Sequence, residues 1–256
     1  HHTTLAPSLN MNFPDEPKIH AHRSIARSRE FSGPILFCDA DVEFSEDAFL
    51  LLHRALEESR QSFAAYAEVE ARPDTGCLLG RLQQQFYTKK KCLPPRRHLH
   101  GRCFILKDWL EEFCPETCNV PLDAPSHMNL GAGPSVDDIH YSRVIAHKFG
   151  PEAILRVPEA RVVYAPPHSW SELYRDTFRT QYELARLALL FPEHNYVQED
   201  VFAGRQTGLK MAFHLGPQGG LYHLIEKAMT CHARRAIHVK RKSPKSWKSQ
   251  GQNHHG

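Results

Sequence analysis

Two aspartates one residue apart, Asp39 and Asp41, follow directly on a short apolar run, Ile35–Phe37. Apolar runs of this length, bounded by chain-breaking residues, are typical of buried strands. A carboxylate is expensive to remove from water without a partner, so two of them at a strand end indicate a bound cation. Hard divalent ions prefer carboxylate oxygens. The pattern therefore predicts a divalent metal site, with a surface turn or a helix cap as the alternative.

A second acidic pair, Asp137 and Asp138, follows a segment rich in glycine and proline and opens a predicted helix. The helix dipole favours negative charge in the first turn, which is the simpler explanation of the pair. A carboxylate placed there is also a candidate general base. His168 follows the break at Pro166-Pro167, and it is either an ordinary polar loop residue or a metal ligand.

The apolar periodicity along the chain predicts an α/β fold in which strands and helices alternate. We expect strands at 35–38, 63–71, 101–106, 154–157 and 161–165, with Pro158 separating the last two. We expect helices at 21–30, 45–61, the first part of 81–98, 107–113, 135–149, 169–190 and parts of 205–238, where Gly216, Pro217, Gly219 and Gly220 interrupt. In open α/β sheets, ligands bind at the carboxyl ends of strands, which is where Asp39 and Asp41 lie.

Residue spacing also predicts how two of these helices begin, end and face the core. Ser45 is expected to cap the helix over 45–61, with Phe44 and Phe49 at the spacing of a hydrophobic staple. Gly150 is expected to end the helix over 135–149. In that helix we expect a buried face of Ile139, Ile145, Ala146 and Phe149, with His140 and His147 toward solvent.

Composition bounds the class of protein. The chain has 256 residues, of which 41% are hydrophobic, and this suits one large domain or two small ones. The net charge is only +3, but the last 25 residues are basic and contain no acidic residue. This indicates a solvated basic tail, with a contact to an anionic membrane or nucleic acid as the alternative. The seven scattered cysteines and the lack of an apolar run of about 18 residues lead us to expect a cytoplasmic protein.

From about residue 20 to residue 190, the order of these features resembles the family two glycosyltransferases. Their GT-A fold is a Rossmann-like mixed sheet flanked by helices. In that family an Asp-x-Asp holds Mg²⁺ or Mn²⁺ on the donor diphosphate, and Asp39 and Asp41 match it. The resemblance makes Asp138 the catalytic base, with Asp137 beside it, and it implies that His168 is a further metal ligand.

The resemblance also implies substrate contacts. We expect Arg102, Trp109, Arg179 and Gln181 to bind substrate. Arg179 and Gln181 are similar to residues on the family's helix over the active site, although a solvated helix face explains Arg179 equally well. Trp109 resembles part of the acceptor-side segment, with a core position as its alternative.

The activity that the resemblance implies is metal-dependent transfer of a sugar from a nucleoside-diphosphate donor to a hydroxyl group. The acceptor would be a glycan, a lipid-linked molecule or a small molecule, and nucleic acid is not favoured as a partner. The resemblance implies a single base and direct displacement, and therefore inversion at the anomeric carbon, with retention, which related GT-A proteins also show, as the alternative. The processive Gln-x-x-Arg-Trp signature is absent from the sequence, so a processive polymerase is not expected.

The chain departs from the family pattern ahead of Asp39. Only 38 residues precede it, too few for the βαβ unit that binds the nucleotide in that family. We therefore expect an irregular arm over 1–20, a partial, N-terminally truncated GT-A-like domain over 21–192, a helical extension over 193–238 and a disordered basic tail over 239–256. Two alternatives stay open: a non-catalytic GT-A-like binding remnant, and a metal-dependent phosphohydrolase or nucleotidyltransferase that uses Asp39 and Asp41.

Overall fold

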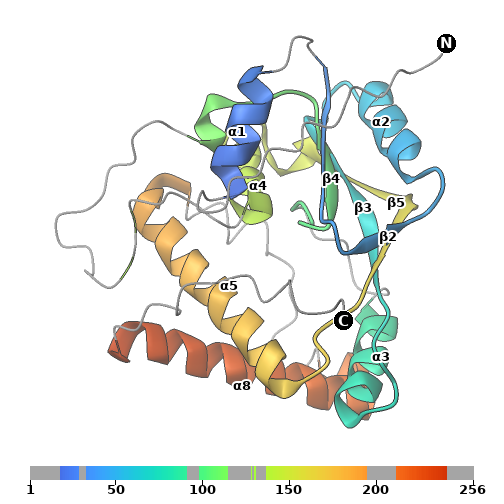
Figure 1. Ribbon diagram of the computed structural model, residues 1–256, viewed down its shortest axis with the longest axis vertical. Helices are drawn as coiled ribbons and strands as arrows, with labels where there is room; N and C mark the ends of the chain where they lie inside the picture. Colours follow the sequence, from blue (N-terminus) through green and yellow to red (C-terminus); the bar gives the residue numbers. More distant parts are fainter. Residues whose placement is uncertain are drawn as a thin grey trace, which may run out of the picture.

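A computed structural model describes residues 18–28, 33–90, 98–114, 128, 130, 137–194 and 212–240. These residues form a mixed α/β fold in which helices flank a five-stranded sheet and a helical C-terminal region follows (Figure 1). The predicted α/β class is confirmed. Residues 1–17 of the predicted arm, most of the loop ahead of Asp137 and the tail beyond Lys240 lie outside the described residues. The arm was predicted to reach residue 20, but a helix already begins at Lys18.

The sheet has the strand order β1-β4-β3-β5-β2. Its strands are β1 (Ile35–Cys38), β2 (Val42–Phe44), β3 (Ala64–Ala71), β4 (Cys103–Leu106) and β5 (Ile154–Tyr164). Only β3 and β5 pair in parallel, and the other three pairs are antiparallel. Residues 39–41 alone join β1 to β2, yet these strands lie at opposite ends of the strand order. The sheet is therefore so strongly curved that it is nearly closed, like a barrel.

The strand β5 is continuous through Pro158, where we expected two separate pieces. Ala67 pairs with Val157, but the next residue of β3, Glu68, pairs with Arg161. Residues 158–160 therefore form a bulge opposite β3. Proline cannot donate a ladder hydrogen bond, so a bulge is where a strand accommodates it.

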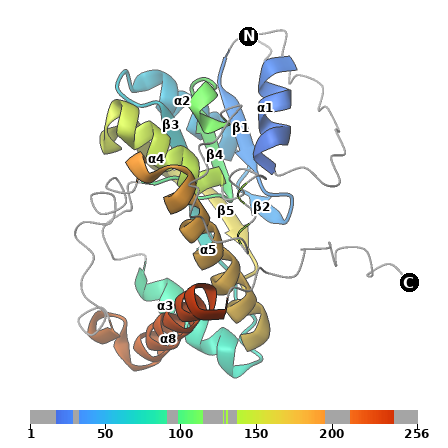
Figure 2. The same ribbon diagram turned by 90° about the vertical axis from the view of Figure 1, so that its left-hand side faces the viewer.

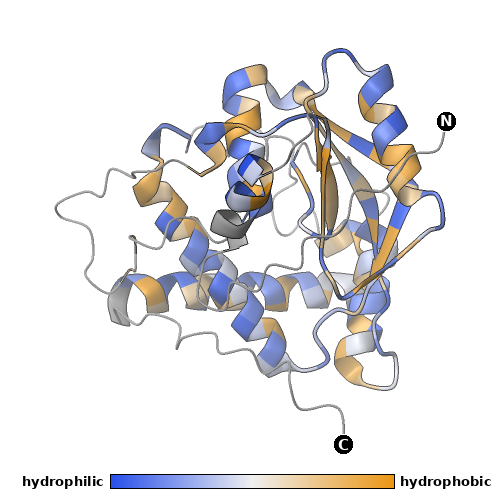
Figure 3. Cartoon of the chain, turned by 45° about the horizontal axis from the view of Figure 1, so that its top comes forward, coloured by the Kyte–Doolittle hydropathy of each residue, from blue (hydrophilic) through white to orange (hydrophobic). Residues whose placement is uncertain are grey.

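The two faces of the sheet carry different helices. Helices α1 (Lys18–Ser28) and α4 (Asp137–Phe149) cover one face, and α2 (Ala48–Glu58) covers the other (Figure 1). In α2, residues Ala48, Leu52 and Leu56 recur every fourth position and are buried against the sheet. Each buried leucine contributes about 1.5–3 kcal/mol to folding. Figure 3 shows the matching pattern, with apolar residues concentrated along the strands.

The start of α2 differs from the prediction. The helix begins at Ala48, and its N-cap residue Asp47 makes no side-chain cap hydrogen bond. Ser45 does not cap the helix; its hydroxyl accepts a hydrogen bond from the backbone N–H of Arg161 at 3.2 Å, which fixes the chain to β5. The predicted contact between Phe44 and Phe49 is confirmed, with ring centroids 4.7 Å apart.

Helix α4 is buried all round between residues 140 and 146 rather than on one stripe. His140 is completely buried and its Nε2 lies 3.0 Å from the carbonyl oxygen of Phe113, so its predicted solvent position is wrong. Phe149, predicted to be buried, is 45% exposed. Tyr141 faces the sheet cluster while the His140 ring contacts Phe191, so protein covers opposite sides of the helix. Gly150 ends the helix as predicted, at a φ of +86°.

Three further helices pack together at the lower end of the molecule in Figure 2. They are α3 (Leu78–Lys90), α5 (Trp170–Leu190) and α8 (Gly216–Lys240). Leu82, Leu173 and Tyr222 join them in one buried cluster. Gly219 was expected to interrupt the helix, but it lies inside α8. A Cβ at this position would come within 3.2 Å of the Phe86 Cα on α3. This close approach of two backbones explains the glycine.

The shorter elements are 3-10 helices. They are η1 (Glu111–Phe113), η2 (Pro151–Ala153) and η3 (Pro192–His194). The helix predicted over 107–113 is reduced to η1, because the backbone N–H of Lys107 pairs with the carbonyl of Phe63 as a continuation of the sheet. In the described parts of the chain, none of the helices combines the length and apolar character needed to cross a bilayer.

Candidate functional site

The pairing of β1 with β4 positions the first aspartate. Cys38 lies opposite Cys103 at the end of this antiparallel ladder. One step further, the backbone N–H of Asp39 donates to the carbonyl oxygen of Arg102 at 3.0 Å. The residue that follows β1 therefore lies beside the residue that precedes β4, although the two are 63 positions apart in the sequence.

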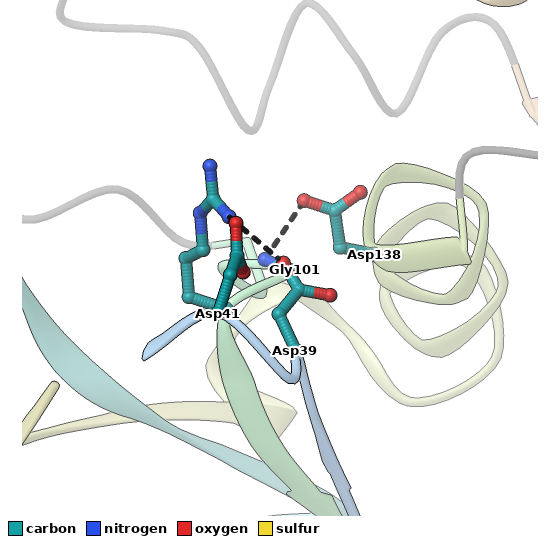
Figure 4. A network of polar contacts seen from close by, with 5 residues as sticks. Asp39, Asp41, Gly101 and Asp138 are labelled. Carbon is teal, nitrogen blue, oxygen red and sulfur yellow. Dashed lines mark hydrogen bonds and ion pairs between the residues drawn. The ribbon is translucent and has the colours of Figure 1, made fainter. Parts of the chain in front are cut away.

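One nitrogen of Arg102 contacts both aspartates of the Asp-x-Asp pair, which Figure 4 labels. Its Nη1 donates to Oδ2 of Asp39 at 3.2 Å, and to Oδ1 and Oδ2 of Asp41 at 3.1 and 3.3 Å. The side chains of Arg102 and Asp39 are 27% and 28% exposed, and that of Asp41 is 74% exposed. The group is open to solvent, and its two carboxylates converge on one positively charged atom.

Asp138 reaches the same place from α4. Its Oδ2 accepts the backbone N–H of Gly101 at 2.9 Å, and its Oδ1 accepts the backbone N–H of Ile139 at 2.9 Å. Gly101 is the neighbour of Arg102, so both acidic groups are held at adjacent residues (Figure 4). A Cβ at Gly101 would lie 3.0 Å from Oδ2 of Asp138, so the absence of a side chain permits this approach.

Ser142 fixes α4 to the segment that carries Gly101 and Arg102. Its hydroxyl donates to the carbonyl oxygen of Asp138 at 2.5 Å and accepts the backbone N–H of Leu99 at 2.8 Å. Ser142 is 3% exposed. The distance between Asp138 and the Arg102 group is therefore maintained by hydrogen bonds of the buried Ser142 hydroxyl.

Asp137, the neighbour of Asp138 in the sequence, has different surroundings. Asp137 is 5% exposed, and its Oδ2 lies 3.9 Å from Nδ1 of His22 on α1. The same His22 nitrogen lies 3.0 Å from the hydroxyl of Tyr141. Of the predicted catalytic pair, Asp138 thus lies with the Asp-x-Asp group and Asp137 lies between α4 and α1.

Tyr164 and a further acidic residue, Asp176, also affect Arg102. The guanidinium carbon lies 4.5 Å from the ring centroid of Tyr164, whose hydroxyl donates to that of Tyr87 at 3.3 Å. Burial raises the pKa of Tyr164. Burial also raises the pKa of the Asp176 carboxyl on α5, against the opposing charges of Arg179, Arg175 and Arg102. The sequence analysis missed Asp176, whose only signal was its position between Arg175 and Arg179 on one helix.

The predicted substrate-binding residues lie in three different surroundings. Arg102 is central to the site, and Arg179 lies near enough to Asp176 for its charge to act there. Trp109 packs edge-to-face on Phe113 with ring centroids 5.4 Å apart, and it lies partly buried against the core. Gln181 accepts a hydrogen bond from Nε of Arg234 at 2.7 Å and joins α5 to α8.

The predicted metal ligands are brought together only in part. His168 is exposed, and its backbone N–H donates to the carboxylate of Glu172 at 2.8 Å. Within the described residues, no three His, Cys, Asp or Glu side chains gather as a set of metal ligands. The predicted third ligand is therefore not supported by its position.

Asp39 and Asp41 by themselves fit a divalent cation. Both carboxylates contact one atom that carries positive charge, so one cation in that place would reach both of them. Mg²⁺ is commonly bound by one or two carboxylates, with water and substrate phosphates as its other ligands. The donor set present would therefore suit Mg²⁺ or Mn²⁺ if phosphate oxygens and water supplied the other ligands.

Comparisons with known proteins add no family assignment. No protein-family model matches the chain, and no curated protein shows significant similarity to its sequence.

Proposed function

We propose that this protein is a glycosyltransferase that moves a sugar from a nucleoside-diphosphate donor to a hydroxyl acceptor. One observation carries the proposal: Asp138 and the pair Asp39 and Asp41 meet at two adjacent residues, Gly101 and Arg102. Metal-dependent, inverting sugar transfer needs a cation site for the diphosphate and a base for the acceptor at one place. The resemblance to family two glycosyltransferases, and with it a GT-A-like fold, belongs to the same proposal.

In this proposal Asp138 is the base. Its two oxygens each accept one backbone N–H, which orients the carboxylate and leaves lone pairs for an incoming hydroxyl. The carboxylate removes the proton as the acceptor oxygen forms its bond to the anomeric carbon and the bond to the diphosphate breaks. The diphosphate leaves with the electron pair of that bond, and direct displacement inverts the anomeric centre.

Asp39 and Asp41 would hold Mn²⁺ or Mg²⁺. Such an ion neutralises the negative charge that develops on a departing diphosphate. Arg102 would supply further positive charge to the diphosphate, and its guanidinium carbon lies 4.5 Å from the ring centroid of Tyr164. Arg179 adds positive charge near Asp176, on which the charge of Arg102 also acts. The acceptor class stays a hydroxyl on a glycan, a lipid-linked molecule or a small molecule.

The test is release of nucleoside diphosphate from a panel of nucleotide sugars, with and without Mn²⁺. We expect metal-dependent release by the wild type, and at least a hundredfold loss in Asp41→Asn and Asp138→Asn. Asp47→Asn is the matched control, because Asp47 is an exposed aspartate that makes no cap hydrogen bond. Release without metal, or equal release by all variants, would refute the proposal, and release of free phosphate instead would indicate a phosphohydrolase.

A non-catalytic binding module is the second candidate, and one observation favours it. Arg102 already neutralises part of the charge of Asp39 and Asp41, so the pair is stable without a metal. Binding of nucleotide sugars by a folded wild type that shows no turnover in any donor and acceptor combination would favour this candidate.

A further inference from the structure

The proposed metal position and the Arg102 guanidinium compete for one place. Nη1 of Arg102 lies within 3.3 Å of oxygens from both Asp39 and Asp41. A divalent ion bonds carboxylate oxygens at about 2.0–2.6 Å, closer than any of these hydrogen bonds. An ion that bound both carboxylates would therefore need the position that Nη1 now fills, and the two positive charges would also repel each other.

The guanidinium has support that does not depend on the two aspartates. Its carbon lies 4.5 Å from the ring centroid of Tyr164, a stacking position that arginine favours. The start of the side chain is fixed as well, because the carbonyl of Arg102 accepts the backbone N–H of Asp39. Loss of the carboxylate contacts would thus leave Arg102 beside the site rather than release it to solvent.

The contacts that hold Arg102 on the aspartates are also weak enough to exchange. The Asp41 side chain is 74% exposed, and ion pairs open to solvent contribute little to stability because water screens them. A guanidinium, by contrast, binds two oxygens of one phosphate at once through its planar fork. A diphosphate held at the same site would be the better partner.

We infer that Arg102 is an exchangeable counter-ion: it holds Asp39 and Asp41 while no metal is bound, and it transfers to the donor's diphosphate when a divalent metal takes its place. This inference rests on the proposed function. It gives Arg102 two opposed effects, because the guanidinium weakens the binding of metal alone and strengthens the binding of diphosphate to the metal-loaded protein. An arginine with a purely structural role would not produce effects of opposite sign.

The test is binding rather than turnover, with Mn²⁺ alone followed by pyrophosphate at saturating Mg²⁺. Free Mn²⁺ is measured by electron paramagnetic resonance, and pyrophosphate binding by calorimetry against a protein-free blank. In Arg102→Gln we expect Mn²⁺ to bind roughly three- to tenfold more tightly, because the variant removes the cation that competes for the two carboxylates. We expect pyrophosphate to bind at least tenfold more weakly.

Three variants make the outcomes separable. Arg102→Met is a second neutral variant that keeps the apolar stem, in case Arg102→Gln folds poorly. Arg72→Gln is the control, because it removes an arginine that donates to both oxygens of one carboxylate, that of Glu43, away from the site. Asp41→Asn should lose Mn²⁺ affinity whether or not Arg102 is also replaced.

Each outcome decides one claim. Unchanged or weaker Mn²⁺ binding by both Arg102 variants would overturn the inference and leave the metal site standing. Tighter Mn²⁺ binding with unchanged pyrophosphate binding would overturn the transfer to diphosphate. A wild type and Arg102→Gln that both fail to bind Mn²⁺ would refute the metal site itself, and with it the metal-dependent reaction proposed above.

Discussion

The backbone N–H of Gly101 donates to Oδ2 of Asp138 across 2.9 Å, so the candidate base is seated on the main chain of the residue before Arg102. The contact needs the hydrogen of glycine at this position, because a Cβ would lie 3.0 Å from the same oxygen. A backbone donor cannot rotate away as a side chain can. The position of Asp138 relative to Asp39 and Asp41 therefore follows from the main chain between Leu99 and Cys103.

Replacing Gly101 by alanine tests this contact. The added methyl group would displace the Asp138 carboxylate by a few tenths of an ångström or more, and small misplacements of a reacting group can cost up to about a hundredfold in rate. We expect Gly101→Ala to lose roughly ten- to a hundredfold in nucleoside-diphosphate release, with little change in melting temperature. The measurement pairs that assay with a thermal melt.

The chain offers a close control for this variant. A Cβ at Gly76 would also lie 3.0 Å from an aspartate oxygen, Oδ1 of Asp74, and the Gly76 N–H also donates to that oxygen. Gly76→Ala therefore introduces the same crowding away from the site. Equal losses of activity in the two variants would show that the Gly101 contact has no special role.

The two adjacent aspartates of α4 should respond in opposite ways to replacement. Asp138→Asn should keep the fold and lose at least a hundredfold in turnover, the usual size of a general-base contribution. Asp137→Ala should lower the free energy of unfolding by about 1–3 kcal/mol, because Asp137 is buried against His22. The residual folded Asp137→Ala protein should keep most of its activity per folded molecule. Urea denaturation and the release assay, measured on the same samples, check both halves.

Acid should destabilise the protein through its buried histidines. Burial lowers the pKa of His140 to about 3, and burial also lowers the pKa of His194. Below a pH of about 6.5 the unfolded chain therefore binds protons that the folded His140 does not, and the free energy of unfolding falls with pH down to about 3. One such imidazole contributes up to about 1.4 kcal/mol per pH unit.

The measurement for this prediction is urea denaturation of the wild type and His140→Gln between pH 7 and pH 5. The stability advantage of the wild type should shrink as the pH falls, because the glutamine variant has no imidazole to protonate. His53→Gln is the control, since the His53 side chain is 43% exposed beside Glu57. Parallel pH profiles for the wild type and His140→Gln would contradict the prediction.

The contact between α3 and α8 should not tolerate a larger residue at Gly219. A Cβ there lies 3.2 Å from the Phe86 Cα and 3.3 Å from the Leu215 Cβ, so Gly219→Val would force the two helices apart. We expect a loss of about 1–3 kcal/mol in the free energy of unfolding. Gln218→Val introduces the same side chain at the neighbouring exposed position of α8 and should cost less than about 1 kcal/mol. Similar losses in the two variants would argue against close packing at Gly219.

Local sequence patterns predicted the bounds of helices and strands better than they predicted which side chains are buried. The apolar run at Ile35–Phe37 and the long amphipathic segment up to Leu190 became β1 and α5 close to the expected bounds. The burial of His140 was missed, because α4 is covered on opposite sides and a one-sided stripe was assumed. Periodicity reports how polar a helix is, and it does not report how many neighbours the helix has.

In the candidate site, too, the sequence predicted individual residues better than the contacts that surround them. Residue type and position at element ends singled out Asp39, Asp41 and the pair Asp137 and Asp138, and the family resemblance made Asp138 the candidate base. The sequence did not identify Arg102 as the partner of the first two, because that contact depends on the register Cys38↔Cys103 between strands far apart in the chain. Asp176 was missed for a related reason, since only the packing of α5 brings its charge close to Arg102.

The loop 39–41 runs from one border of the curved sheet to the other, since β1 and β2 are its terminal strands. A ligand bound to Asp39 and Asp41 together would restrain this loop, and with it the two terminal strands that the loop connects. Saturation with such a ligand should slow amide hydrogen exchange in β1 and β2 more than in the central strand β3. Binding at the site could therefore be measured from the exchange rates of the two terminal strands.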